Sequence, residues 1–375
     1  MHIILAVTND ISTDQRVIRT AITLSRLPAR VTIIGRQFGN LTLSVPGVRT
    51  RQMWLVFKRG PLFYTEYNIR LFIMLLFVKA DIYAANDLDT LPAVFFASRL
   101  KKKAVVYDSH EYFTEVPELV DRTTVKKIWE RIEAYLLPRI RYASTVSSSI
   151  AHAYKQKYGI NMEIIRNLPV KKVLPADVST TGQGRQHTIL YQGALNKGRG
   201  LELAIQAMKF MPETTLKIIG TGDIEGALKQ LVVNLNLAGV VYFTGRIKAE
   251  DLQHITADAD LGISLEEDLG LSYRYALPNK VFDYIQAQIP VLVSDLPEMS
   301  HLIESFGVGQ VCKTREPEML AGIFTDMLTN KEKRMLWKTN LGNASRELCW
   351  EKEEFKIISL YQKALHGLKT KGSAI

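Results

Sequence analysis

The sequence predicts an α/β protein of two domains, each built around a parallel β-sheet. The chain has 375 residues, more than a single hydrophobic core usually serves. Short apolar segments rich in β-branched residues alternate with longer helix-like segments, which is typical of βαβ units. This alternation occurs twice, once on each side of a polar stretch over residues 169–187 that is rich in Pro, Gly, Ser and Thr.

Six segments of the first half have the composition of buried strands. Helix-like stretches separate them, so right-handed crossovers are expected to join them into one doubly wound sheet. The predicted strands are 2–7, 30–35, 81–86, 103–108, 143–148 and 163–167.

The second half repeats this pattern and then ends in a helix. Apolar residues close to helical spacing, among them Trp350, Phe355 and Leu365, predict a terminal helix after a turn at 343–345. The predicted strands are 188–193, 215–220, 240–245, 261–266, 291–295 and 309–313. The predicted organisation is a first domain over 1–168, a linker over 169–187, a second domain over 188–345 and a C-terminal helix over 346–375.

Composition excludes several classes of protein. A hydrophobic content of 47% with 23% charged residues is that of a soluble globular protein. The two cysteines, Cys312 and Cys349, form no disulfide framework, which favours a reducing, cytoplasmic location. The first ten residues lack the basic region of a signal peptide. The longest apolar run, residues 71–78, is too short to cross a membrane.

The net charge of +10 is compatible with nucleic acid, an anionic membrane surface or a phosphate-bearing ligand as partner. No motif typical of nucleic-acid binding occurs, so nucleic acid is not expected. Residues 51–72 mix Arg and Lys with Trp, Phe, Tyr and Leu, which suits peripheral docking on an anionic membrane, at its inner face. The alternative is an ordinary loop and core helix in which Trp54, Phe57 and Phe63 are buried.

The segment 275–298 is the most informative for function. A polar turn precedes Asn279 and Lys280, a short amphipathic helix follows, and an apolar strand comes next. The helix start offers free N–H groups and a positive dipole end to a phosphate. Asp283 lies one turn into the helix, at the carboxyl end of a parallel sheet, where it can accept hydrogen bonds from ribose hydroxyls.

A basic turn follows the first strand of the second domain. Lys197 and Arg199 lie between Gly193 and a helix that begins near Leu201. Glycines let a backbone approach a phosphate closely, and arginine binds phosphate with two hydrogen bonds. The turn therefore predicts a diphosphate site, with a basic surface loop as the alternative.

Further candidate residues, polar ones and glycines, follow other predicted strands or open the first helix. His110 suits hydrogen bonding to a sugar hydroxyl, although a satisfied histidine at a strand end is the alternative. Arg16 could equally be a surface ion-pair partner. No second histidine stands at metal-ligand spacing, so no zinc site is expected. These candidates are Asp14, Arg16, Asp108, His110 and Glu111 in the first domain and Gly220, Gly222, Gly245 and Arg246 in the second.

In order and placement, these segments resemble the nucleotide-sugar glycosyltransferases of family 4. The match rests on LPNKVFDY at 277–284, the basic turn at 193–200, DSHE at 108–111 and DQRV at 14–17. The resemblance implies a GT-B fold, with two Rossmann-like domains facing a cleft and the last helix packing back on the first domain. It also implies transfer of a sugar from a nucleoside diphosphate to an acceptor hydroxyl, with retention, in cell-surface polysaccharide or glycolipid synthesis.

The resemblance also assigns roles to residues. The expected partners are a nucleotide-sugar donor and a sugar or lipid-linked sugar acceptor, and neither a metal nor another cofactor is implied. The catalytic candidates are His110, Arg199 and Lys197. The donor-binding candidates are Asp283, Lys280, Asn279, Glu267, Gly220, Gly222 and Arg246, and the acceptor-side candidates are Arg16, Asp14 and Glu111.

The chain departs from the family at one carboxylate. Retaining members usually carry Glu, seven residues and a second Glu, but the position eight residues before Asp283 is Tyr275. Glu267 lies sixteen residues before Asp283. Either a longer loop brings Glu267 to the donor sugar, or the first carboxylate is absent. Two other functions also stay open, a GT-B nucleotide-sugar epimerase and a non-catalytic GT-B partner subunit.

Overall fold

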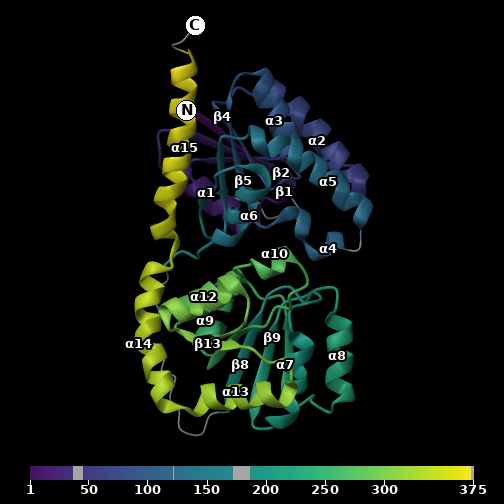
Figure 1. Cartoon of the computed structure of the whole chain (residues 1–375), viewed down its shortest axis with the longest axis vertical. Coiled ribbons are helices and arrows are strands. Elements are labelled where there is room, and N and C mark those ends of the chain that lie inside the picture. The colour runs from purple at the N-terminus through teal and green to yellow at the C-terminus, as the bar shows by residue number, and fades with distance from the viewer. Residues whose placement is uncertain (37–44, 121, 172–185, 373–375) are drawn as a thin grey trace. The chain divides into compact units, whose positions relative to one another are not determined.

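The structure is a computed structural model that describes residues 1–36, 45–120, 122–171 and 186–372 (Figure 1). The chain forms two compact units. The first comprises Met1–Asn167 and Glu353–Ile375, and the second comprises Leu168–Lys352. Most of the predicted linker, residues 172–185, lies outside the described residues. Each unit is an α/β domain around its own parallel sheet.

The first unit contains a seven-stranded sheet in the order β3-β2-β1-β4-β5-β6-β7, with every neighbouring pair parallel. All six predicted strands are present. The strand that the sequence did not predict is β3, an edge strand whose sequence VRTRQ has one apolar residue. The strands are β1 (His2–Asp10), β2 (Arg30–Arg36), β3 (Val48–Gln52), β4 (Ile82–Asn86), β5 (Ala104–Ser109), β6 (Tyr142–Thr145) and β7 (Glu163–Ile164).

Capping residues set the ends of several helices in this unit. Asp14 caps α1, since its Oδ1 accepts a hydrogen bond from the backbone N–H of Val17 at 3.1 Å. Ser147 caps α6 in the same way, and Gly159 ends it in the left-handed conformation. The helices are α1 (Gln15–Ser25), α2 (Gly60–Phe77), α3 (Leu91–Leu100), α4 (Pro117–Val120), α5 (Thr123–Leu136), α6 (Ser148–Tyr158) and α15 (Trp350–Gly372).

Helix α2 has an apolar exposed side. Figure 1 shows α2, α3 and α5 side by side over the first sheet, and α2 packs on α3. The buried residues of α2 are Phe63, Tyr67, Leu71 and Leu75. Phe63 is buried as the simpler interpretation of 51–72 required, but Trp54 is 70% exposed and Phe57 is 43% exposed. That interpretation is therefore wrong for two of its three aromatic residues.

The last helix packs on the first unit, as the GT-B resemblance implied. Glu353 at its start pairs with Arg166 at 2.9 Å, and Lys363 pairs with Glu163 at 2.7 Å. Gly367 allows close contact, because a Cβ there would lie 2.0 Å from the hydroxyl of Tyr142. The chain therefore returns to its first sheet after completing the second unit.

The predicted turn at 343–345 is wrong, because these residues belong to α14 (Lys331–Glu347). Asn343 and Ser345 suggested a turn, but the helix continues past both residues. The side chain of Gln286 donates hydrogen bonds to the carbonyl oxygens of Ser345 and Leu348, at 2.7 and 3.0 Å. These bonds satisfy carbonyl groups that the end of α14 leaves open.

The second unit contains a six-stranded parallel sheet in the order β10-β9-β8-β11-β12-β13, and all six strands were predicted. They are β8 (His187–Gln192), β9 (Thr214–Ile219), β10 (Val241–Gly245), β11 (Leu261–Ser264), β12 (Val291–Ser294) and β13 (Gly309–Cys312). The helices are α7 (Leu201–Ala207), α8 (Glu225–Asn234), α9 (Ala249–Ala257), α10 (Leu271–Arg274), α11 (Asn279–Gln286), α12 (Pro297–Phe306), α13 (Pro317–Thr329) and α14.

Within the described part of the chain, no helix has both the length and the apolar character needed to cross a membrane.

Candidate active site

The loops at the carboxyl edge of the second sheet pack tightly on one another. Gly220 follows β9 with φ of 136°, and a Cβ there would lie 1.8 Å from the carbonyl oxygen of Gly193. Gly200 has φ of 70°, and a Cβ there would lie 2.1 Å from the carbonyl oxygen of Leu265. These glycines are therefore required by neighbouring protein backbone. Packing against backbone is thus a reason for glycine at these two positions that does not involve a phosphate.

A buried carboxylate, Glu266, organises the cations at this edge. Its Oε1 lies 2.6 Å from Nζ of Lys280 and 3.5 Å from Nη1 of Arg199. Its Oε2 accepts a hydrogen bond from Ser264 at 2.7 Å. Arg315 donates to the backbone carbonyl oxygens of Leu265 and Glu266 and so supports the same loop.

The charges of this cluster are set by burial and by the partners. Burial alone would raise the pKa of Glu266, but Lys280 and then Arg199 outweigh it and hold that pKa below its usual range. Burial lowers the pKa of Lys280, an effect that Glu266 opposes. Burial would also lower the pKa of Arg199, but Glu266 outweighs it and the pKa is raised.

This cluster carries more cationic than anionic groups. Arg199 and Lys280 face one carboxylate, and the Nε of Arg199 is buried without a hydrogen-bond partner among the described residues. The guanidinium of Arg199 also lies over the ring of Tyr273, 4.8 Å from its centroid. An anion bound here would offset the excess positive charge.

The other predicted residues of the second unit follow strands or open helices of the same sheet. Asp283 accepts a hydrogen bond from Gln192 at 3.1 Å, which places it at the end of β8. The backbone N–H of Glu267 donates to the carbonyl of Gly198 at 2.8 Å, so its segment is tied to the basic turn. Lys197, Asn279 and Arg246 are exposed.

The sequence prediction chose Glu267 and missed Glu266. The two residues are adjacent glutamates, so residue type does not distinguish them. Their burial does, because Glu266 continues the buried run of β11 while Glu267 is only partly buried. The predicted strand 261–266 already ended at Glu266. A charged residue that ends a buried strand was therefore the signal that could have identified it.

In the first unit, a network of charged side chains surrounds His110 at the carboxyl edge of the sheet. Its Nδ1 lies 3.2 Å from Asp87 and its Nε2 lies 3.3 Å from Asp108. The backbone N–H of His110 also donates to Asp87 at 2.8 Å. Arg16 binds Asp108 through two hydrogen bonds, of 2.7 and 2.8 Å.

These carboxylates keep the imidazole protonated. Burial alone would lower the pKa of His110, but the charge of Asp87 and the contact with Asp108 outweigh it and raise the pKa to about 9. Burial would raise the pKa of Asp108, but Arg16 outweighs it and holds that pKa well below its usual range. His110 is thus an imidazolium near neutral pH.

The expected acceptor-side role of Arg16 needs correction. Its side chain is 3% exposed and is occupied by Asp108 and by the carbonyl oxygen of Ile165. The alternative of an ion-pair partner describes it better, although the pair is buried. Asp14 is the cap of α1, and Glu111 is exposed. The charge of Asp14 still acts on Arg16, since it helps to raise the pKa of that guanidinium.

The sequence analysis did not select two aspartates of the first unit as candidate site residues. Asp87 and Asp89 form an Asp-x-Asp tripeptide after β4, and Asp87 has a left-handed φ of 64°. Asp89 is buried and accepts a hydrogen bond from Thr8 at 2.5 Å. Burial and the charge of Asp87 raise the pKa of Asp89 to about 7. A search of the described residues finds no group of three or more His, Cys, Asp or Glu side chains that could hold a metal ion.

The chain was compared with protein families, curated proteins and solved structures. Residues 178–343 match the model of the family described as Glycosyl transferases group 1. No curated protein matches the chain. The resemblance to GT-B glycosyltransferases is confirmed. The group 1 match falls inside the second unit, which contains Arg199, Glu266 and Lys280.

Solved structures of GT-B glycosyltransferases share the fold over nearly the whole chain. Sucrose-phosphate synthase from Thermosynechococcus elongatus has a TM-score of 0.80 at 15% identity, over 98% of this chain and 100% of that one. HepE from Anabaena, in complex with UDP and glucose, has a TM-score of 0.72 at 16% identity, over 98% and 99%. WaaG, a glycosyltransferase involved in lipopolysaccharide biosynthesis, has a TM-score of 0.71 at 15% identity, over 94% and 98%.

Proposed function

We propose that the chain transfers a sugar from a nucleoside-diphosphate sugar to an acceptor hydroxyl, with retention at the anomeric carbon, as in family 4. The observation that carries the proposal is the buried cluster in which Glu266 holds Lys280 and Arg199 at the carboxyl edge of the second sheet. The carboxyl ends of the strands are where open α/β sheets bind ligands. Two cations against one carboxylate suit a diphosphate.

In the proposed reaction, the bond between the anomeric carbon and the diphosphate oxygen breaks. Arg199 and Lys280 stabilise the negative charge that develops on this leaving group. The acceptor oxygen bonds to the anomeric carbon and its proton passes to the leaving phosphate. Asp283 binds the ribose, and His110 stays the catalytic candidate of the first unit. The proposal includes no metal or other cofactor.

The donor and the biological role are proposed from structures that share the fold. UDP is the nucleotide to test first, because the HepE structure contains UDP and glucose. A role in cell-surface polysaccharide or glycolipid synthesis is supported by WaaG, whose structure is described as that of a lipopolysaccharide-biosynthesis enzyme. Glu266 is occupied by the two cations, so Glu267 stays the candidate for contact with the donor sugar.

Nucleotide binding by an Arg199→Ala variant tests the proposal. We expect the Kd for UDP, measured by calorimetry, to rise at least tenfold, because Arg199 contacts the diphosphate (about 1.4 kcal/mol per tenfold). The Kd for uridine should not change. Arg274→Ala is the matched control, because Arg274 is an exposed arginine of the same unit that pairs with Asp268. Equal losses for UDP and uridine would exclude Arg199 as a diphosphate ligand.

Incubation with a UDP-sugar alone separates the rival activities. A glycosyltransferase without acceptor gives slow hydrolysis and no isomer, whereas an epimerase gives an epimer. A partner subunit without activity gives neither hydrolysis nor, after addition of acceptors, transfer.

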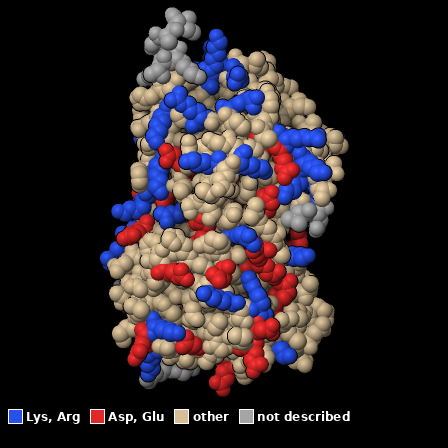
Figure 2. Space-filling view, in the orientation of Figure 1, with Lys and Arg blue, Asp and Glu red and all other residues tan. Residues whose placement is uncertain are grey.

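We also propose that the first unit docks on an anionic membrane, where a lipid-linked sugar acceptor is presented. The excess positive charge belongs to this unit, which has 28 Lys and Arg against 16 Asp and Glu, while the second has 20 against 22. Figure 2 shows Lys and Arg spread over the first unit's visible face. Helix α2 adds exposed apolar side chains at Leu62, Ile69, Ile73 and Phe77.

A further inference from the structure

A cation-lined pocket of about 680 Å³ lies in the first unit, away from His110. It is formed where β5 and β6 begin, so it lies at the amino edge of the sheet, and His110 follows the opposite, carboxyl edge. The end of α3 and one side of α15 complete its wall. Its cationic lining residues are Arg99, Lys102, Lys103, Arg139 and Arg141.

The charge of this pocket is poorly neutralised by the protein. Among the residues that the structure describes, no Asp or Glu lines it. Lys103 pairs with Asp81 at 3.4 Å, outside the lining residues. Within the described residues, Arg99, Lys102 and Arg141 have no ion-pair partner. Like charges that share a pocket repel one another, and a bound anion relieves that repulsion.

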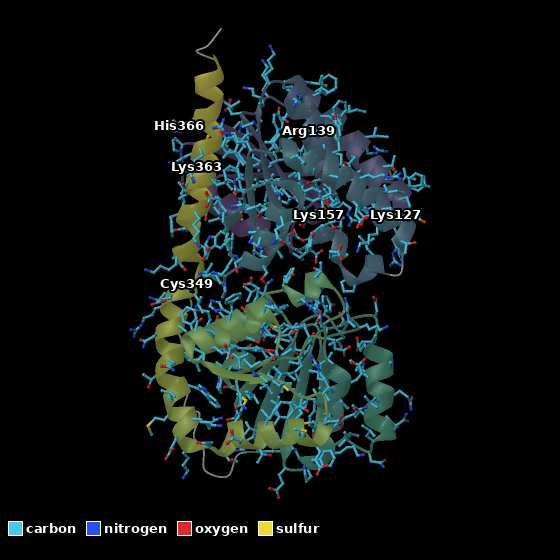
Figure 3. All side chains as sticks on the ribbon, in the orientation of Figure 1. Lys127, Arg139, Lys157, Cys349, Lys363 and His366 are labelled. Atoms are coloured by element: carbon cyan, nitrogen blue, oxygen red, sulfur yellow. The ribbon has the colours of Figure 1, made fainter. Side chains whose placement is uncertain are left out.

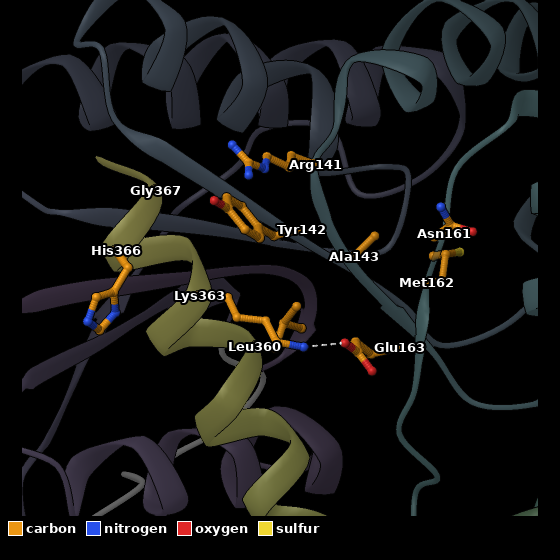
Figure 4. A pocket seen from close by; sticks show the side chains of 10 residues that line it. All are labelled: Arg141, Tyr142, Ala143, Asn161, Met162, Glu163, Leu360, Lys363, His366 and Gly367. Atoms are coloured by element: carbon orange, nitrogen blue, oxygen red, sulfur yellow. Dashed lines mark hydrogen bonds and ion pairs between the residues drawn. The ribbon is translucent and has the colours of Figure 1, made fainter. Parts of the chain in front are cut away.

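A neighbouring pocket provides a contrast. It shares Arg141, Tyr142 and Gly367 with the first, and its cation Lys363 projects from α15 (Figures 3 and 4). Lys363 is paired with Glu163 at 2.7 Å, which Figure 4 draws as a dashed line. Among its described lining residues, Arg141 and Lys363 therefore stand against Glu163. The pocket beside α3 has the larger excess of cations of these two pockets, with five against no described carboxylate.

The surroundings of the pocket are apolar on two sides. Phe95, Ile140 and Leu368 line it, and Leu100, next to the lining residue Arg99, is 67% exposed. Phe77 at the end of α2 is 83% exposed, and α2 packs directly on α3. An amphiphile with an anionic head would match both the cations and these apolar side chains.

We propose that this pocket is a second anion site, which binds a phosphate ester separately from the donor site of the second unit. Arginines and lysines that converge on one pocket favour phosphate, since each N–H donor can bind one of its oxygens. The phosphate belongs either to an anionic phospholipid headgroup or to a soluble phosphate ester. Anion binding at this pocket does not require glycosyl transfer. The experiment therefore measures binding and not enzymatic activity.

The test compares the double variant Arg99→Gln/Arg141→Gln with the control Lys331→Gln/Lys338→Gln. Both lose two exposed cations, but the control residues lie on α14 of the second unit. Binding to phosphatidylglycerol vesicles is measured by co-sedimentation, and binding of glycerol 3-phosphate by calorimetry. UDP binding checks that each variant is folded and that the donor site is intact.

We expect vesicle binding of the pocket variant to fall at least fivefold below that of the control, with UDP binding unchanged. Loss of vesicle binding without measurable glycerol 3-phosphate binding identifies the lipid headgroup as the source. Specific loss of glycerol 3-phosphate binding identifies a soluble phosphate ester. Equal binding by the two double variants, to vesicles and to glycerol 3-phosphate, overturns the proposal, because net charge alone would then explain any attraction.

Discussion

Glu266 shows how a residue can support a ligand site without facing a ligand. A buried carboxylate is costly unless it is paired and hydrogen-bonded, and Lys280, Arg199 and Ser264 meet that condition. In return, Glu266 fixes the positions of two cations that would otherwise repel each other. The proposed diphosphate site is thus preorganised by an anion beneath it.

Residue identity at the site was only partly predictable. The sequence pointed to Arg199, Lys280, Asp283 and His110 because they follow strands or open helices, where ligands of parallel sheets bind. Glu266 was missed because residue type does not show which of two adjacent glutamates points inward. Asp87 was missed because its contact with His110 joins β4 and β5, which only the folded sheet brings together.

The charge network around His110 predicts a pH-dependent stability. The pKa of His110 is raised from 6.5 to about 9, so its stabilisation is fully present below pH 6.5 and is lost as the pH rises through about 9. We expect the free energy of unfolding, measured in urea, to fall between pH 6.5 and 9. In His110→Gln this fall should be absent.

Asp89→Asn is the control for this pH experiment. The pKa of Asp89 is raised from 3.8 to about 7, so its contribution to stability is present below pH 3.8 and is lost as the pH rises to about 7. This pH range lies below that of His110. The variant should therefore keep the fall above pH 7. A wild-type free energy of unfolding that stays constant from pH 6.5 to 9 would contradict the proposed imidazolium.

At the scale of elements, hydrophobic pattern predicted twelve of the thirteen strands in the described part of the chain. The exception, β3, lies at the sheet edge, where few of its side chains need to be buried. Composition was less reliable for turns, since the turn predicted at 343–345 is part of α14. Side-chain hydrogen bonds from Gln286 bind carbonyl oxygens at the end of that helix. The role of the loop glycines also depends on partners distant in sequence, which local pattern does not show.

Gly200 connects loop packing to the proposed donor site. Its left-handed φ and the 2.1 Å approach of the Leu265 carbonyl leave no room for a Cβ. Gly200→Ala should push the basic turn away from Glu266, lower the unfolding free energy by more than 1 kcal/mol and raise the Kd for UDP about tenfold. Urea unfolding and calorimetry measure these two quantities.

Gly322→Ala is the matched control for Gly200→Ala. Gly322 lies within α13, and a Cβ there would meet no atom within 4 Å. This substitution should raise the free energy of unfolding by about 0.5–1 kcal/mol through helix propensity and leave UDP binding unchanged. If Gly200→Ala behaves like Gly322→Ala, the packing of this turn does not determine nucleotide affinity.

At the scale of the whole molecule, charge is divided unequally between the units. The first has a net charge of +12 and the second −2, from the same counts of 28 against 16 and 20 against 22. The last helix contributes little to this division, because it adds four lysines and two glutamates to the first unit. The exposed apolar side chains of α2 and its preceding loop belong to the same unit.

Membrane docking is the prediction that follows from this division. The protein should co-sediment with anionic vesicles at low salt and be released at high salt, because charge attraction is screened while apolar insertion alone is weak. Trp54→Ser/Phe77→Ser should lower vesicle binding at least tenfold without changing charge. Met335→Ser/Leu336→Ser, which alters two exposed apolar residues of α14, should leave it unchanged. If the wild-type protein stays in the supernatant with anionic vesicles at low salt, the membrane proposal fails and a soluble acceptor is expected.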